Sequence, residues 1–249
     1  MLCRRAAWHG AAQPHSRAAM EHWQSFGPRP APQGAWAEAF PAAMPDGSAL
    51  ALPLRDLGAT GVAGFVANQA AFAVVHRLAG WMTDLARPLG AEVVVGLPTL
   101  GQVFAPLVAE ALSHANWVAP GWSRKRWYEE RLSVPAQSIT SPGERRLWLD
   151  PRLLSRLAGR RVLLVDDVIS TGASARAGLA LLAAAGVTPV ALLVAMAQGD
   201  RWMRDWADAV PVRAVFATPV FARAAAGWVP LPATAPHEIC PLMPKDLAA

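Results

Sequence analysis

The stretch RVLLVDDVISTGAS, residues 161–174, joins an apolar run to two adjacent carboxylates and then to a small, hydroxyl-rich turn. The apolar run predicts a buried strand, and the SARAGLALLAAAG that begins at residue 174 predicts a helix ended by Gly186. Adjacent like charges repel each other, so a strand end is a poor place for them without a partner. The turn after this strand is therefore predicted to bind a ligand.

Strands and helices alternate along most of the chain. Apolar residues make up 53% of the sequence, which is ample for a buried core. Alternation of this kind is typical of an α/β fold with a doubly wound, mostly parallel sheet. The patterns predict strands at 49–58, 92–97, 117–122, 160–167, 189–197 and 212–218, and helices at 64–87, 101–114, 151–159 and 174–185.

Three segments are expected from composition. Residues 1–48 are rich in Ala, Pro, Gly and Trp and are predicted to be partly irregular, 49–225 to form the α/β domain, and 226–249 to form a Pro-rich tail. The first residues contain no continuous apolar run and do not resemble a secretory signal. Met1 and Met20 remain alternative starts of translation.

Cysteine content and hydropathy favour a cytoplasmic protein. Cys3 and Cys240 are the only cysteines and lie near opposite ends, which provides neither a disulfide framework nor a zinc site. The uncharged stretch 178–197 approaches the length of a membrane span. Gly186 and Pro189 divide it, however, which favours a helix, a turn and a strand, and no membrane association is expected.

The positive charge is concentrated in one segment. Ten basic residues lie between positions 124 and 161, against four acidic ones, which leaves a local charge of +6. Such a segment suits a polyanion or a phosphorylated small molecule, and a solvated basic face is the alternative. It lacks aromatic interleaving beyond Trp127 and Tyr128, so no stable nucleic-acid partner is expected. The basic residues are Arg124, Lys125, Arg126, Arg131, Arg145, Arg146, Arg152, Arg156, Arg160 and Arg161.

Two turns are predicted to face one crevice, because ligands of open parallel sheets bind beyond the carboxyl ends of the strands. Residues 170–174 enter a helix, whose free backbone N–H groups and positive dipole end suit a phosphate. Carboxylates repel phosphate but accept hydrogen bonds from hydroxyl groups. A ligand with a phosphate at one end and a diol nearby satisfies both, and ribose 5-phosphate has that shape.

VLLVDDVISTGAS resembles the phosphoribosyl pyrophosphate (PRPP) signature of the type I phosphoribosyltransferases, with a purine- or xanthine-type character. The resemblance implies that Asp166 and Asp167 meet the ribose 2- and 3-hydroxyls. An ordinary strand-to-helix turn with a Ser or Thr cap is the alternative. The residues implied to hold the 5-phosphate are Ser170, Thr171, Gly172, Ala173 and Ser174.

Two further segments resemble parts of the same family. GLPTLGQVFA, residues 96–105, resembles the pyrophosphate loop, which implies that the loop of Pro98, Thr99, Leu100 and Gly101 presents backbone amides to pyrophosphate. The basic segment 123–149 resembles the mobile catalytic loop, which implies a catalytic role for Arg124 and Lys125. A general base stays open among Tyr128, Glu129 and Glu130.

The resemblance also implies a small hood, contributed by the N- and C-terminal segments, that sets base specificity, and it implies a reaction. A ring nitrogen attacks C1 of PRPP and displaces pyrophosphate, with Mg²⁺ carried mainly by PRPP and no direct metal ligand expected from the chain. GFVANQ, residues 64–69, resembles the purine-contacting segment of xanthine-type members, so Phe65 and Asn68 are candidates for base binding, with ordinary helix residues as the alternative. A purine is favoured over orotate or another heterocycle, and a homodimer is expected.

A binding function is the main rival to catalysis. The same fold serves as a PRPP sensor that regulates genes without transferase activity. Such regulators carry an additional winged-helix DNA-binding domain, and residues 1–48 lack the periodic helices that it requires.

Overall fold

A four-stranded parallel sheet forms the centre of the protein. The computed structural model describes residues 22–136, 145–206 and 210–244, so Met1, Cys3 and Met20 lie outside the described residues. The strand order is β10-β9-β8-β5, and every neighbouring pair is parallel. The strands are β5 (Val93–Gly96), β8 (Val162–Ile169), β9 (Ala191–Gln198) and β10 (Val212–Thr218).

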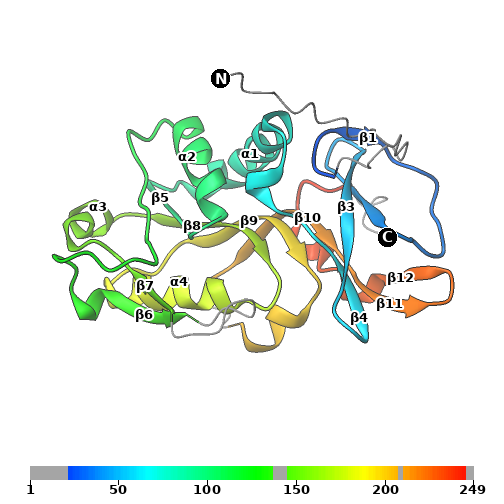
Figure 1. Ribbon diagram of the computed structural model, residues 1–249. Coiled ribbons are helices and arrows are strands. Elements are labelled where there is room, and N and C mark those ends of the chain that lie inside the picture. The colour runs from blue at the N-terminus through cyan, green and yellow to red at the C-terminus, as the bar shows by residue number, and fades with distance from the viewer. Residues whose placement is uncertain (1–21, 137–144, 207–209, 245–249) are drawn as a thin grey trace, which may run out of the picture.

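Helices cover both faces of this sheet. Alternate residues of a strand point to opposite faces, and Leu163 and Val165 of β8 join one core cluster while Val162 and Leu164 join the other. Figure 1 shows α1 and α2 on one face and α4 on the other. The predicted doubly wound α/β sheet is thus confirmed. The helices are α1 (Phe72–Ala86), α2 (Gly101–Ala111), the short α3 (Leu154–Leu157) and α4 (Ala173–Ala184).

A second, antiparallel sheet, called the hood below, lies beside the parallel sheet (Figure 1). Its order is β1-β3-β4-β11-β12, with β2 paired to β3. It therefore combines strands that precede the parallel sheet in the sequence with strands that follow it. The expected hood from the terminal segments is therefore confirmed. Its strands are β1 (Phe26–Pro28), β2 (Ala39–Ala43), β3 (Ser48–Asp56), β4 (Thr60–Ala63), β11 (Val220–Ala224) and β12 (Gly227–Leu231).

The described part of the N-terminal segment is more regular than its composition predicts. It contributes β1 and β2, and Trp36 forms a bridge to Trp228 across nearly the whole sequence. These partners lie far along the chain, which is why local periodicity does not reveal them. The expected boundaries after residues 48 and 225 stay a prediction. They lie close to the starts of β3 and β12.

The helix predicted to begin at residue 64 begins at Phe72 instead. Before it, Gly64 donates its N–H to Pro53 O, and Trp23 Nε1 donates to Gly64 O. These tertiary hydrogen bonds hold the start of the segment out of the helix, and a short 3₁₀ turn, Ala67–Gln69, follows. The predicted stop before Pro88 is confirmed, because α1 ends at Ala86.

The basic segment also differs from a structureless loop. β6 (Ser133–Ala136) and β7 (Arg145–Trp148) form an antiparallel pair that packs on α4, while residues 137–144 lie outside the described residues. The strand expected at 117–122 is reduced to single bridges, of which Val118 makes one to Val95.

The uncharged stretch 178–197 divides as predicted. α4 ends at Ala184, Gly186 takes a φ of +75°, and β9 begins at Ala191. Within the described ranges, no helix has the length and apolar character needed to cross a membrane.

Candidate active site

The acidic pair lies in the central strand β8, near its carboxyl end. Asp166 and Asp167 are 6% and 7% exposed. β8 does not end at Asp167, as the sequence predicts, but continues to Ile169, because its ladder with β9 extends to the pair Ile169 and Ala197. The Asp167 N–H donates to Asp166 Oδ1 at 2.9 Å. The chain therefore buries two carboxyl groups side by side.

Burial raises the pKa of both carboxyl groups. The pKa of Asp166 lies well above its ordinary 3.8, first because of burial and then because of the neighbouring Asp167 charge. The pKa of Asp167 is raised from 3.8 to about 6, again mainly by burial. The pair therefore releases its two protons in separate steps. Above about pH 6, Asp167 can act as a charged hydrogen-bond acceptor.

The loop 98–101 touches this pair directly. The Gly101 N–H lies close enough to the Asp166 carboxyl group to oppose the rise in its pKa. A Cβ at residue 101 would lie 2.7 Å from Val165 O and 2.8 Å from Asp166 Cα, so only glycine fits against β8 here. The Pro98–Thr99 peptide bond is cis. Thr99 is exposed, whereas Pro98 and Leu100 are half-buried.

The loop 170–174 links β8 to α4. Gly172 caps α4 with a φ of +75°, a left-handed conformation that favours glycine. No side chain caps the helix, although the Ala173 N–H makes a long contact of 3.4 Å with Thr171 Oγ1. Ser174 is exposed. This helix end thus presents backbone donors beside the acidic pair, as an anion site requires.

Arg176 is a site residue that the sequence analysis missed. It lies in the first turn of α4, and its Nη1 would be 2.8 Å from a Cβ at Gly172. Among the described residues, this buried nitrogen has no hydrogen-bond partner. A guanidinium nitrogen without a partner is costly unless a ligand completes it. The signal in the sequence was a lone Arg in an otherwise Ala- and Leu-rich helix.

Gln198, the last residue of β9, was also missed. It is 9% exposed, its Oε1 accepts a hydrogen bond from Ser170 Oγ at 2.7 Å, and its Nε2 donates to Ala63 O at 2.6 Å. Ser170 and Gln198 are thus in contact, although 28 residues separate them in sequence.

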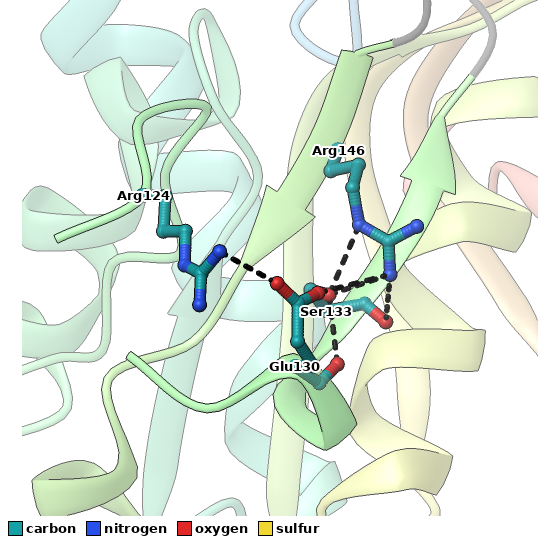
Figure 2. Close-up of polar contacts among 4 residues, drawn as sticks. All are labelled: Arg124, Glu130, Ser133 and Arg146. Atoms are coloured by element: carbon teal, nitrogen blue, oxygen red, sulfur yellow. Dashed lines mark hydrogen bonds and ion pairs between the residues drawn. The ribbon is translucent and has the colours of Figure 1, made fainter. Parts of the chain in front are cut away.

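Arg124 belongs to a polar network that we call the Glu130 cluster: Arg124, Glu130, Ser133 and Arg146 (Figure 2). Arg124 Nη1 lies 2.8 Å from Glu130 Oε1, and Arg146 Nη2 lies 3.9 Å from Glu130 Oε2. The guanidinium of Arg124 also lies over the Trp148 ring, 5.2 Å from its centroid. The side chain of Arg124 therefore contacts residues of its own segment, 123–149.

Arg146 fixes the other side of the cluster. Its Nη2 donates to Ser133 Oγ at 2.7 Å, and Ser133 Oγ donates to Glu130 O at 2.8 Å. Lys125, the second predicted catalytic cation, is exposed.

The remaining basic residues do not all lie on the same side of the protein as the acidic pair. Arg160 Nη1 lies 2.7 Å from Glu92 Oε1, and the Arg161 N–H donates to the same carboxylate, before the start of β8. This position is at the end of the strand opposite to the acidic pair. The concentration of charge in the sequence therefore overstates the positive charge near Asp166.

The two candidate base-binding residues lie in different environments. The Phe65 ring is buried and stacks on Phe104, with ring centroids 6.3 Å apart. Asn68 is exposed on the 3₁₀ turn that precedes α1. Their role in base binding stays a prediction.

No group of three or more His, Cys, Asp or Glu side chains in the described part of the chain is arranged to hold a metal ion. Cys240, the cysteine that the structure describes, is buried, and burial raises its thiol pKa to about 12.

Comparison with known proteins gives named relatives. An adenine phosphoribosyltransferase from Frankia alni is 32% identical over 137 residues, which are 53% of this chain. The chain spans 65% of the length of that relative. An orotate phosphoribosyltransferase from Xanthomonas axonopodis pv. citri is 45% identical over 62 residues, 23% of this chain and 28% of the relative. An adenine phosphoribosyltransferase structure from Rhodothermus marinus is 20% identical, with a TM-score of 0.47, over 58% of this chain and 79% of that chain.

The phosphoribosyl transferase domain model matches residues 62–222. This range is well over half of the chain and contains β8 with its acidic pair, the loops 98–101 and 170–174, and the Glu130 cluster. The chain therefore belongs to the phosphoribosyl transferase domain family.

Proposed function

We propose that this protein transfers the 5-phosphoribosyl group of PRPP to a nitrogenous base, most readily a purine, and releases pyrophosphate. One observation carries the proposal. The buried Asp166–Asp167 pair lies between two loops, and it contacts one of them through the Gly101 N–H. The N-terminus of α4 thus offers an anion site, the acidic pair accepts hydrogen bonds from hydroxyl groups, and the loop 98–101 offers a second set of backbone amides.

Each part of PRPP has a matching element. The backbone N–H groups of loop 170–174 would bind the 5-phosphate at the α4 N-terminus, and Arg176 Nη1 adds a positive charge beside Gly172. The acidic pair would accept hydrogen bonds from the ribose 2- and 3-hydroxyls. The loop 98–101 would bind the pyrophosphate through its amides.

The reaction breaks the bond between C1 and the pyrophosphate oxygen and forms a bond between C1 and a ring nitrogen of the base. Negative charge leaves on pyrophosphate while C1 gains positive character, so preorganised electrostatics lower the barrier. The Asp167 carboxylate, ionised above about pH 6, would position the ribose and stabilise this positive charge. When bound with PRPP, Mg²⁺ supplies charge neutralisation at the leaving group.

The choice of a purine rests on sequence likeness. The adenine-named relative aligns over 137 residues and the orotate-named one over 62, so the longer match favours a purine. Asn68, exposed before α1, could hydrogen-bond a purine edge. We further propose, from the family resemblance, that the protein is a cytoplasmic homodimer.

The first test is release of pyrophosphate from PRPP with Mg²⁺, screened over adenine, hypoxanthine, guanine, xanthine and orotate. We expect release with one or more purines, and none above background in the double variant Asp166→Asn, Asp167→Asn. Tight binding of PRPP without release with any base would overturn the transferase proposal and favour a PRPP sensor. A preference for orotate would overturn only the choice of a purine.

The Glu130 cluster gives a second prediction. If Arg124 must leave Glu130 to reach pyrophosphate, Glu130→Gln should raise kcat/KM by about two- to fivefold, because an exposed ion pair contributes only about 0–1 kcal/mol. Both side chains are more than half exposed, at 56% and 59%. The gain should shrink at high salt, where the pair is already screened.

A matched control is Glu92→Gln, which removes an exposed pair with Arg160 at the opposite end of β8 from the acidic pair and should leave kcat/KM unchanged. Arg124→Ala should lower kcat/KM instead. If Glu130→Gln lowers it as Arg124→Ala does, Glu130 orients Arg124 for catalysis and does not compete for it.

A further inference from the structure

Gln198 connects the two sheets of the protein at the candidate site. It ends β9 of the parallel sheet, one residue past the last pair of the β8–β9 ladder, and it contacts Ala63 at the end of hood strand β4. The two bonds, of 2.7 Å and 2.6 Å, are short and largely shielded from water. A buried amide with both ends paired is a rigid link, because breaking either end leaves an unsatisfied polar group.

The direction of these hydrogen bonds is fixed by chemistry. The Ala63 carbonyl can only accept, so the amide nitrogen of Gln198 must face it. Gln198 Oε1 must then face Ser170, whose single hydroxyl proton is donated to it. In this arrangement the Ser170 hydroxyl has no proton left for a phosphate, so Ser170 can offer a phosphate only its backbone N–H.

The hood end of the link leads directly to the candidate base-binding segment. Ala63 precedes Gly64, whose carbonyl accepts from Trp23 Nε1, and the chain continues to Phe65 and Asn68. The link therefore joins the loop that would hold the 5-phosphate to the segment that would meet the base. It spans the two ends that a transferase must hold at a set separation.

We propose that Gln198 is a positioning residue that couples the 170–174 loop to the 63–69 segment, so that binding at the phosphate end orders the base end. The inference rests on the proposed function, since it names which groups that site uses. It assigns Ser170 to this link and leaves phosphate binding to the backbone N–H groups, Thr171 and Ser174.

The test is a double-mutant cycle. Gln198→Met removes both polar ends at similar length, and Ser170→Ala removes one donor. Each should weaken PRPP binding about tenfold in calorimetry with Mg²⁺. The double variant should bind PRPP with no lower affinity than the single variant that binds it less tightly. Independent roles would instead multiply to about a hundredfold. Ser170→Thr, which keeps the hydroxyl, should retain affinity.

A matched control is Thr218→Val. Thr218 is fully buried at the end of the adjacent strand β10, in register with Gln198, but its hydroxyl makes only a 3.9 Å contact with Met196 Sδ. This variant should bind PRPP normally. A loss in Ser170→Ala without one in Gln198→Met would show that Ser170 donates to phosphate directly, and would overturn the link.

Hydrogen exchange separates this inference from the proposed function. In ligand-free protein, backbone amides of 63–69 should exchange faster in Gln198→Met than in the wild type or Thr218→Val. In the wild type, PRPP should slow their exchange, and in Gln198→Met it should not. Equal exchange in all ligand-free variants would overturn the link. A wild type that binds no PRPP would overturn the proposed function, with the ligand-free comparison still deciding the link.

Discussion

Asp167→Asn should lower kcat/KM by about a hundredfold and at the same time stabilise the folded protein. The loss follows because hydrogen bonds to a charged acceptor contribute about 1.5–3 kcal/mol, and the amide keeps the shape but not the charge. The gain follows because the wild type buries this carboxyl group beside a second one. At pH 8, removing a group whose pKa is raised from 3.8 to about 6 should add about 3 kcal/mol to the free energy of unfolding.

The sign of this effect can be checked by pH. Below pH 3.8, Asp167 is protonated in both the folded and the unfolded state and costs nothing. Between about pH 3.8 and 6, the unfolded state releases the proton of Asp167 first, so the contribution of Asp167 to stability falls as pH rises and levels off above about pH 6. Urea unfolding from pH 4 to 8 should show this fall in the wild type, and Asp167→Asn should lack Asp167's share of it.

Asp56 provides a control of opposite sign. The Gly58 N–H and then Arg223 lower its pKa, so it stabilises the fold above its unfolded pKa and this contribution is lost as pH falls. Asp56→Asn should therefore be slightly less stable than the wild type at neutral pH. If Asp167→Asn also loses stability at pH 8, its carboxylate has a compensating partner in the fold.

The second large effect is expected at Gly101. Gly101→Ala would place a methyl group within 3 Å of the β8 backbone at Val165 and Asp166, atoms that cannot move without disturbing the central strand. Overpacking of this kind costs about 1–3 kcal/mol, occasionally more. The shift also removes the Gly101 N–H from Asp166, and we expect kcat/KM to fall at least about a hundredfold.

Gly80→Ala is the matched control, because Gly80 lies within α1 and a Cβ there meets nothing within 4 Å. It should raise the free energy of unfolding by about 0.5–1 kcal/mol with no change in activity. Chemical denaturation and steady-state assays would measure both variants. Full activity in Gly101→Ala would mean that the 98–101 loop can separate from β8 without loss, contrary to the proposed site.

The features that the sequence predicts are those encoded by local patterns. The strand–turn–helix units around β5 and β8 follow from apolar runs bounded by glycine. The closeness of their two turns at one edge of the sheet follows from parallel pairing, and the Gly101 contact with Asp166 confirms it. Local patterns also predict the end of β8 too early, because they do not show that pairing with β9 extends the ladder to Ile169.

The features that the sequence did not predict depend on distant partners. Trp36 pairs with Trp228, Gln198 reaches Ala63, and Trp23 holds Gly64 out of the helix, all through contacts that no periodicity encodes. The pairing of Arg124 with Glu130 is likewise a matter of side-chain geometry on a loop. The unpartnered nitrogen of Arg176 becomes informative only once its neighbours are known.

The hood combines strands from early and late parts of the chain, so it can be completed only near the end of synthesis. Its strand β4 is made early, but β11 and β12 emerge only after all four strands of the parallel sheet. A nascent chain can therefore assemble β5, β8 and β9 with the acidic pair in place while β4 still lacks its neighbour β11. The ribosome thus delivers the part of the parallel sheet that holds the acidic pair before the hood can be completed, and the unpaired edge of β4 is the surface that chaperones would have to protect in the interval.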